Sequence, residues 1–100
     1  MRISREHGVT KAEAKLALDK FIVEVMTEYG SGNSQDRYDW NADLLEFSLN
    51  TTGLEITGSI EVSDSIVILE VTLPSIAKVF EPLARKRAEL ALDTVFQQAD

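Results

Sequence analysis

The order of the hydrophobic patterns limits what this chain can fold into more than any other feature of its sequence. Apolar residues recur at helical spacing over 14–29, four short stretches alternate apolar and polar residues over 38–73, and helical spacing returns over 84–99. A helix repeats every 3.6 residues and a strand every 2, so these periods predict two helices around a group of strands. At 100 residues the chain is long enough for one core, and we expect a single domain over 1–100.

Local signals mark where the first helix begins and ends. Thr10-Lys11-Ala12-Glu13 has the pattern of a capping box, in which the threonine hydroxyl accepts a hydrogen bond from the glutamate amide. Gly30 is placed to end the helix, and the polar segment 30–36 is expected to be a surface loop.

The predicted strands are joined by turns too short for anything but antiparallel neighbours. The clearest strand covers 54–62, with apolar residues on one side and polar residues on the other. A helical turn is expected at 76–80, with Pro82 in the first position of the last helix. The apolar face of the sheet must be covered, and the helices are the available cover. The sequence therefore predicts an α+β fold: a helix, a four-stranded antiparallel meander sheet and a C-terminal helix, with both helices packed on one face of the sheet.

The chain offers few residues that perform covalent chemistry. It has no cysteine and a single histidine, His7, and it contains neither a glycine-rich phosphate loop nor a cluster with metal-ligand spacing. A general base needs an orienting partner and a nucleophile within reach, and the sequence supplies no such pattern around His7. We therefore expect no catalytic residue, no cofactor, no metal site and no enzymatic activity, and we interpret His7 as structural.

The charge balance argues against binding to nucleic acid. The formal net charge is −7, whereas nucleic-acid binders cluster Lys and Arg against phosphates. The one dense basic segment, Arg85-Lys86-Arg87, is expected to pair with Glu81, Glu89 and Asp93 at helical spacing. No run of about 20 apolar residues predicts a membrane span, and the start of the chain has no apolar signal segment. Together with the absence of cysteine, these features favour the cytoplasm.

The predicted elements carry more apolar residues than one core-facing stripe requires. The surplus residues fall outside the main stripe of either helix, or on the far side of the last strand: Leu16, Val23, Ile66, Ile68, Leu83 and Leu90. They are the candidate contact surface. Three explanations remain open: internal packing or simple exposure, self-association as a homodimer, and contact with an apolar surface or a partner protein.

An alternative function is the binding of a small apolar ligand between the helices and the sheet. The large side chains of Phe21, Met26, Trp40 and Phe47 are expected to line such a pocket. Gly58, in the middle of a predicted strand, would admit the close approach of a ligand or of a helix backbone. This alternative rests on analogy between folds.

A family resemblance adds a function to this outline. The residues that carry it are His7-Gly8-Val9-Thr10, Glu13-Ala14-Lys15, Trp40-Asn41-Ala42-Asp43, Gly58 with Ile60 and Val62, and Leu73-Pro74. In this succession, from about Ile3 to about Leu92, the chain resembles the polyhydroxyalkanoic acid system proteins of bacteria. The resemblance implies a non-enzymatic accessory protein of polyhydroxyalkanoate storage that contacts the granule surface or a granule protein. Ala42 stands where that family usually has glycine, which predicts a different turn.

Overall fold

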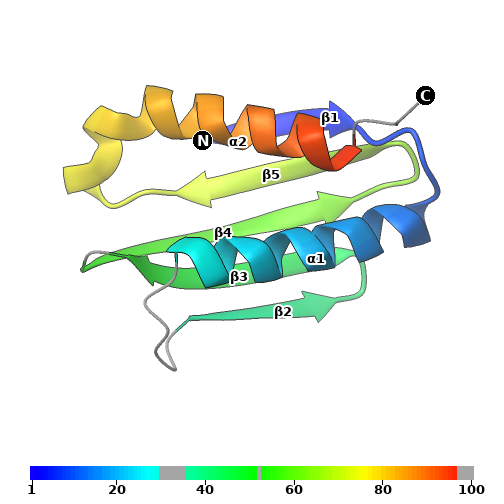
Figure 1. The fold of residues 1–100 in the computed structure, drawn as a ribbon, viewed down its shortest axis with the longest axis horizontal. Helices are drawn as coiled ribbons and strands as arrows, with labels where there is room; N and C mark the ends of the chain where they lie inside the picture. The colour runs from blue at the N-terminus through cyan, green and yellow to red at the C-terminus, as the bar shows by residue number, and fades with distance from the viewer. Residues whose placement is uncertain (30–35, 52, 97–100) are drawn as a thin grey trace.

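The computed structural model describes residues 1–29, 36–51 and 53–96 (Figure 1). These residues form five strands, two α-helices and a short 3₁₀ helix. In chain order the elements are β1 (Arg2–Glu6), α1 (Lys11–Tyr29), β2 (Arg37–Asn41), β3 (Leu44–Thr51), β4 (Leu54–Val62), β5 (Ile66–Thr72), η1 (Ser75–Phe80) and α2 (Glu81–Phe96). The α+β class and the helical turn before the last helix are confirmed.

The strands form one antiparallel sheet in the order β1-β5-β4-β3-β2. The predicted meander from β2 to β5 is confirmed, whereas the prediction of four strands is wrong because β1 is a fifth. β1 pairs with β5 and places Ile3 opposite Leu69. Its alternation is faint, since Ile3 is the one buried residue among polar neighbours and a single apolar position defines no period. The pairing covers the edge that β5 would otherwise expose.

Both helices cover the same face of the sheet, as predicted (Figure 1). The chain passes from β1 at one edge, through α1, to β2 at the other edge. One row of paired positions runs across the sheet beneath the helices, and its buried members are Ile3, Leu69, Ile60 and Leu45. Leu18 and Ile22 of α1 and Leu92 of α2 belong to the same buried core. One apolar layer therefore lies between the sheet and the two helices.

The first turn of α1 confirms the predicted capping box. The amide of Glu13 donates to Oγ1 of Thr10 at 3.1 Å, and the amide of Thr10 donates to Oε1 of Glu13 at 3.1 Å. The hydrogen bond that the Thr10 amide donates lowers the pKa of the Glu13 carboxyl below its ordinary value, and the hydrogen bond from the Thr10 hydroxyl adds a smaller effect in the same direction. The predicted helix end at Gly30 lies outside the described residues, as do positions 30–35 of the predicted loop.

The hairpin between β2 and β3 corrects one expectation. Ala42 has a φ of 56°, in the left-handed region that favours glycine. The turn therefore keeps a backbone conformation suited to glycine although alanine occupies it, and the prediction of a different turn is wrong. Helix α1 holds the hairpin: Nζ of Lys15 donates to the carbonyl oxygen of Ala42 at 2.8 Å, and Nζ of Lys11 pairs with Asp43 at 2.9 Å.

Gly58 lies beside an aromatic ring. Its partner across the β3–β4 pair is Phe47. A Cβ at position 58 would lie 2.6 Å from Cζ of Phe47 and 2.6 Å from the carbonyl oxygen of Glu70. The Phe47 ring thus uses the space that the missing side chain leaves. The space on the Cβ side of Gly58 is therefore taken by the two neighbouring strands and not by a helix backbone.

Candidate functional site

Large exposed apolar side chains gather where β5 leads into α2. Ile76, Val79, Phe80 and Leu83 are between 54 and 76% exposed. We call these four residues the apolar corner. Single exposed apolar residues are common on soluble proteins, but four of them close together form the kind of patch that marks an interaction site.

The backbone of the apolar corner is anchored to the fold. Ala77 is buried, and its amide donates to the carbonyl oxygen of Pro74 at 2.9 Å. The amide of Glu81 donates to the carbonyl oxygen of Lys78, so η1 continues directly into α2. Because the buried alanine faces the core, the large residues on either side of it face outward.

The sequence prediction included Leu83 but missed Ile76, Val79 and Phe80. A signal was present, since positions 76, 79, 80 and 83 follow the i, i+3, i+4, i+7 spacing of a helical stripe. Such a stripe is normally assigned to the core. Here the core-facing position belongs to the small residue Ala77, and the stripe faces solvent.

The structure divides the six predicted contact residues between two faces. Four of them are 43 to 60% exposed on the helix layer: Leu16 and Val23 on α1, Leu83 and Leu90 on α2. Ile66 and Ile68 are half-buried on the face of the sheet that the helices leave uncovered, as their register with Glu6 and Ser4 shows. We call this second face the open sheet face. The six residues therefore do not form one continuous surface.

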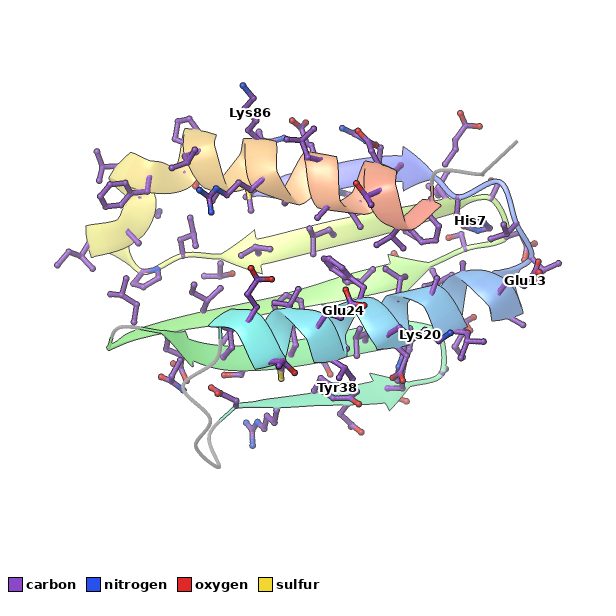
Figure 2. All side chains as sticks on the ribbon, in the orientation of Figure 1. His7, Glu13, Lys20, Glu24, Tyr38 and Lys86 are labelled. Atoms are coloured by element: carbon purple, nitrogen blue, oxygen red, sulfur yellow. The ribbon has the colours of Figure 1, made fainter. Side chains whose placement is uncertain are left out.

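The acidic residues of α2 pair with strand β1 and not with the basic segment of α2 itself. Arg5 on β1 pairs with Asp93 at 2.9 Å and with Glu89 at 3.5 Å. The prediction that the acidic residues of α2 neutralise Arg85-Lys86-Arg87 is therefore wrong, and these three cations form no ion pair within the part of the chain that the structure describes. Lys86 projects from α2 on the side away from α1 (Figure 2).

An apolar groove lies between the two helices, with the sheet as its floor, and we call it the interhelical groove. Its volume is about 480 Å³. Phe21 and Val25 contribute to the α1 wall, and Ala84, Ala88 and Ala91 contribute to the α2 wall. Alanine side chains are short, so they leave open a space that larger residues would fill. The floor consists of Phe47, Leu49, Ile56, Ile60, Leu69 and Val71.

The groove contains two of the four residues predicted to line a ligand pocket. Phe21 and Phe47 line it, whereas Met26 and Trp40 do not. Trp40 lies on β2, where its Nε1 donates to Oδ1 of Asp19 at 3.0 Å. The indole therefore fastens α1 to the β2 edge of the sheet and takes no part in the groove.

His7 is buried next to the turn between β4 and β5, with 1% of its surface exposed. Its Nδ1 accepts from the amide of Val9 at 3.3 Å, and its Nε2 lies 2.8 Å from the carbonyl oxygen of Ser63. This pattern assigns the ring proton to Nε2, which donates to Ser63. The two ring nitrogens thus bond to backbone groups of two different loops, Nδ1 to the loop before α1 and Nε2 to the turn between β4 and β5. Among the described residues, no three side chains of His, Cys, Asp or Glu gather as a metal site.

Nearly the whole chain matches one family model. That model, described as "putative polyhydroxyalkanoic acid system protein", covers residues 1–96. The chain belongs to this family. The match to the polyhydroxyalkanoic acid system proteins includes the apolar corner and the interhelical groove, and it supports a role related to polyhydroxyalkanoate. No curated protein and no solved structure matches the chain. Neither helix, over the residues described, has the length and apolar character needed to cross a membrane.

Proposed function

We propose that this protein is a non-enzymatic accessory protein of polyhydroxyalkanoate storage in the bacterial cytoplasm, and that it binds the polyester granule surface through the apolar corner. The observation that carries the proposal is the exposure of Ile76, Val79, Phe80 and Leu83. The family match supports the link to polyhydroxyalkanoate, and the exposure of the corner supports this mode of contact.

The energetics of apolar burial favour such a contact. A polyester surface is largely apolar, and water is released when apolar side chains dock on it. Full burial of one large apolar side chain contributes about 1.5–3 kcal/mol. Leu90 extends the exposed apolar surface along α2. Lys86, on the same helix, can lay its aliphatic stem along an apolar surface while its ammonium group stays in water.

Co-sedimentation with amorphous poly(3-hydroxybutyrate) particles tests the proposal. Val79→Ser/Phe80→Ser removes two side chains of the apolar corner. The matched control, Ile66→Thr/Ile68→Thr, removes two apolar side chains from the open sheet face and keeps β-branched residues in the strand. We expect the corner variant to bind at least about tenfold more weakly, since tenfold corresponds to about 1.4 kcal/mol, and the control to bind as the wild type does.

Circular dichroism first establishes that both variants are folded, and an unrelated acidic protein of similar size gives the level of non-specific binding. The proposal fails if the wild type does not bind above that level, or if the corner variant binds as tightly as the wild type. A wild-type dimer that the corner variant converts to a monomer would assign the corner to self-association and would also overturn the proposal.

The interhelical groove favours a second candidate function, the binding of a small ligand with an unbranched acyl chain. Its volume of about 480 Å³ lies within the range typical of small-molecule sites. The charged residues that line it, Glu24 and Glu28 from α1 and Arg87 from α2, are exposed. We therefore expect the acyl chain to lie over the apolar floor and the polar end of the ligand to lie at the rim.

Titration calorimetry with dodecanoate tests this second function. Ala91→Leu adds a larger side chain to the groove wall, and Ala12→Leu makes the same change at an exposed position of α1 outside the groove. We expect Ala91→Leu to abolish binding and Ala12→Leu to preserve it. Equal affinity in the two variants, or no binding by the wild type, would contradict a ligand site in the groove.

A further inference from the structure

The open sheet face carries a concentrated negative charge. Alternate side chains of each strand point away from the helices, and the strand register identifies them. The face presents six exposed carboxylates and two exposed arginines, a net formal charge of −4: Glu6, Asp39, Glu46, Glu55, Glu61, Glu70, Arg2 and Arg37. Most of the net charge of −7 therefore lies on the side of the molecule opposite the helices.

This charge is not neutralised within the described residues. The ion pairs of the structure involve Arg5, Lys11 and Lys15, and none includes a charged residue of the open sheet face. Asp39 and Glu46 lie directly opposite each other across the β2–β3 pair. Like charges in that position destabilise a sheet. The face thus holds a repulsive arrangement that stability alone does not favour.

The composition of the open sheet face is typical of a surface that stays in water. Interface cores are depleted in Asp, Glu and Ser, and enriched in aromatic residues, Met and Arg. Here Ser59 lies between Glu46 and Glu70 in one row of the sheet. The most exposed large apolar side chains lie instead on η1 and on the helices.

The thickness of the molecule separates the two faces electrostatically. Its shortest extent is 21 Å, and in the view along that axis the helices lie in front of the sheet (Figure 1). The Debye length is about 10 Å at 0.1 M ionic strength. When the helix layer rests on a particle, the open sheet face is therefore about two Debye lengths from the particle surface. The charges of the open sheet face are then the part of the bound protein that lies nearest to an approaching particle.

We infer that the granule-bound protein turns its open sheet face to solvent and acts as an electrostatic spacer that keeps polyester particles apart. The inference rests on the proposed granule binding, and it adds an activity located on the face of the sheet that the helices leave uncovered. The partner is a second polyester particle coated with the same protein. Both particles present the same negative face, so they repel each other.

Electrophoretic mobility and salt-induced aggregation of coated poly(3-hydroxybutyrate) particles test the inference. Glu46→Gln/Glu61→Gln halves the net charge of the open sheet face. The matched control, Glu24→Gln/Glu28→Gln, removes the same number of carboxylates from α1. At equal amounts of bound protein, we expect the sheet variant to reduce the mobility contributed by the protein by about half and to lower the NaCl concentration at which particles aggregate. The α1 variant should change both quantities much less.

Different results would overturn the granule binding and the spacer activity. If both variants bind as the wild type does and change mobility equally, the orientation and the spacer activity are overturned while granule binding stands. If the wild type does not sediment with the particles, granule binding and the spacer activity both fall. Unchanged aggregation of particles coated with the sheet variant would also overturn the spacer activity.

Discussion

The two ends of the molecule hold their loops in different ways. Three loops are joined at the end where α1 begins, by a buried histidine, the capping box and the ion pair of Lys11 with Asp43. Figure 2 shows His7 and Glu13 together at this end. At the other end, η1 exposes the apolar corner. The difference indicates that polar contacts fix the fold at one end and that the opposite end provides surface for contact.

His7→Ala should have the largest effect on stability. It leaves the carbonyl oxygen of Ser63 and the amide of Val9 without their partner, and it opens a cavity near Phe96, whose ring centroid lies 6.1 Å from that of His7. We expect the free energy of unfolding to fall by about 2–4 kcal/mol, measured by urea denaturation. A loss below about 1 kcal/mol would contradict the view that this histidine joins the loops.

Ala42→Gly should stabilise the same end. The residue at position 42 has a φ of 56°, and an alanine in the left-handed region costs about 1–2 kcal/mol. Glycine avoids this cost, but part of the gain in stability is lost because glycine gives the unfolded chain more conformational freedom. We expect a gain of about 0.5–1 kcal/mol in urea denaturation. Ala12→Gly, within α1, is the control of opposite sign, because glycine weakens a helix. A destabilised Ala42→Gly variant would disprove the strain at the hairpin.

The ion pairs at this end should make stability depend on pH. The hydrogen bond from Lys11, and then that from Lys15, lowers the pKa of Asp43 below its ordinary value of 3.8. A lowered pKa in the folded state adds stability above pH 3.8, and this contribution disappears as the pH falls through the folded-state pKa.

Asp43→Asn should therefore have a lower urea midpoint than the wild type at pH 6, and the two midpoints should approach each other as the pH falls below 3.8. Glu55→Gln, which removes a carboxylate of the open sheet face that forms no ion pair within the described residues, is the control and should keep the wild-type pH profile. A constant difference between wild type and Asp43→Asn over this range would contradict the assignment.

The apolar corner should contribute least to stability. Val79 and Phe80 are 76 and 63% exposed, so Val79→Ser/Phe80→Ser removes little buried surface. We expect the free energy of unfolding to change by no more than about 0.5 kcal/mol, the range of ordinary surface substitutions. A much larger loss would show that the corner packs within the domain and would remove the contrast between the two ends.

Local patterns predicted the parts of the fold that depend on neighbours in sequence. The capping box at Thr10 and the meander from β2 to β5 follow from spacings of a few residues. β1 was missed because its strand identity depends on β5 far along the chain, and Ile3 alone gives no period. The ion pairs of Arg5 with Glu89 and Asp93 join the two ends of the sequence, and no local pattern encodes them.

The candidate site, too, could be predicted only in part from local sequence patterns. Helical spacing identified Leu83 and Leu90 as surplus residues, and both are exposed. The same spacing at 76–80 could not say which side of the stripe faces the core, because that depends on the burial of Ala77. The interhelical groove depends on the distance between two helices, which a sequence pattern does not give.

The strand β1 is synthesised long before its partner. Each of its residues pairs with a position 60 to 68 residues further along the chain, from Glu6 with Ile66 to Arg2 with Glu70. At translation rates of about 5–20 residues per second, β1 waits roughly 3–14 s for β5 to be made. The hairpins of the meander close through short loops and form early, since the entropy of closing a loop rises with its length. The strand that is made first is therefore the last to enter the sheet.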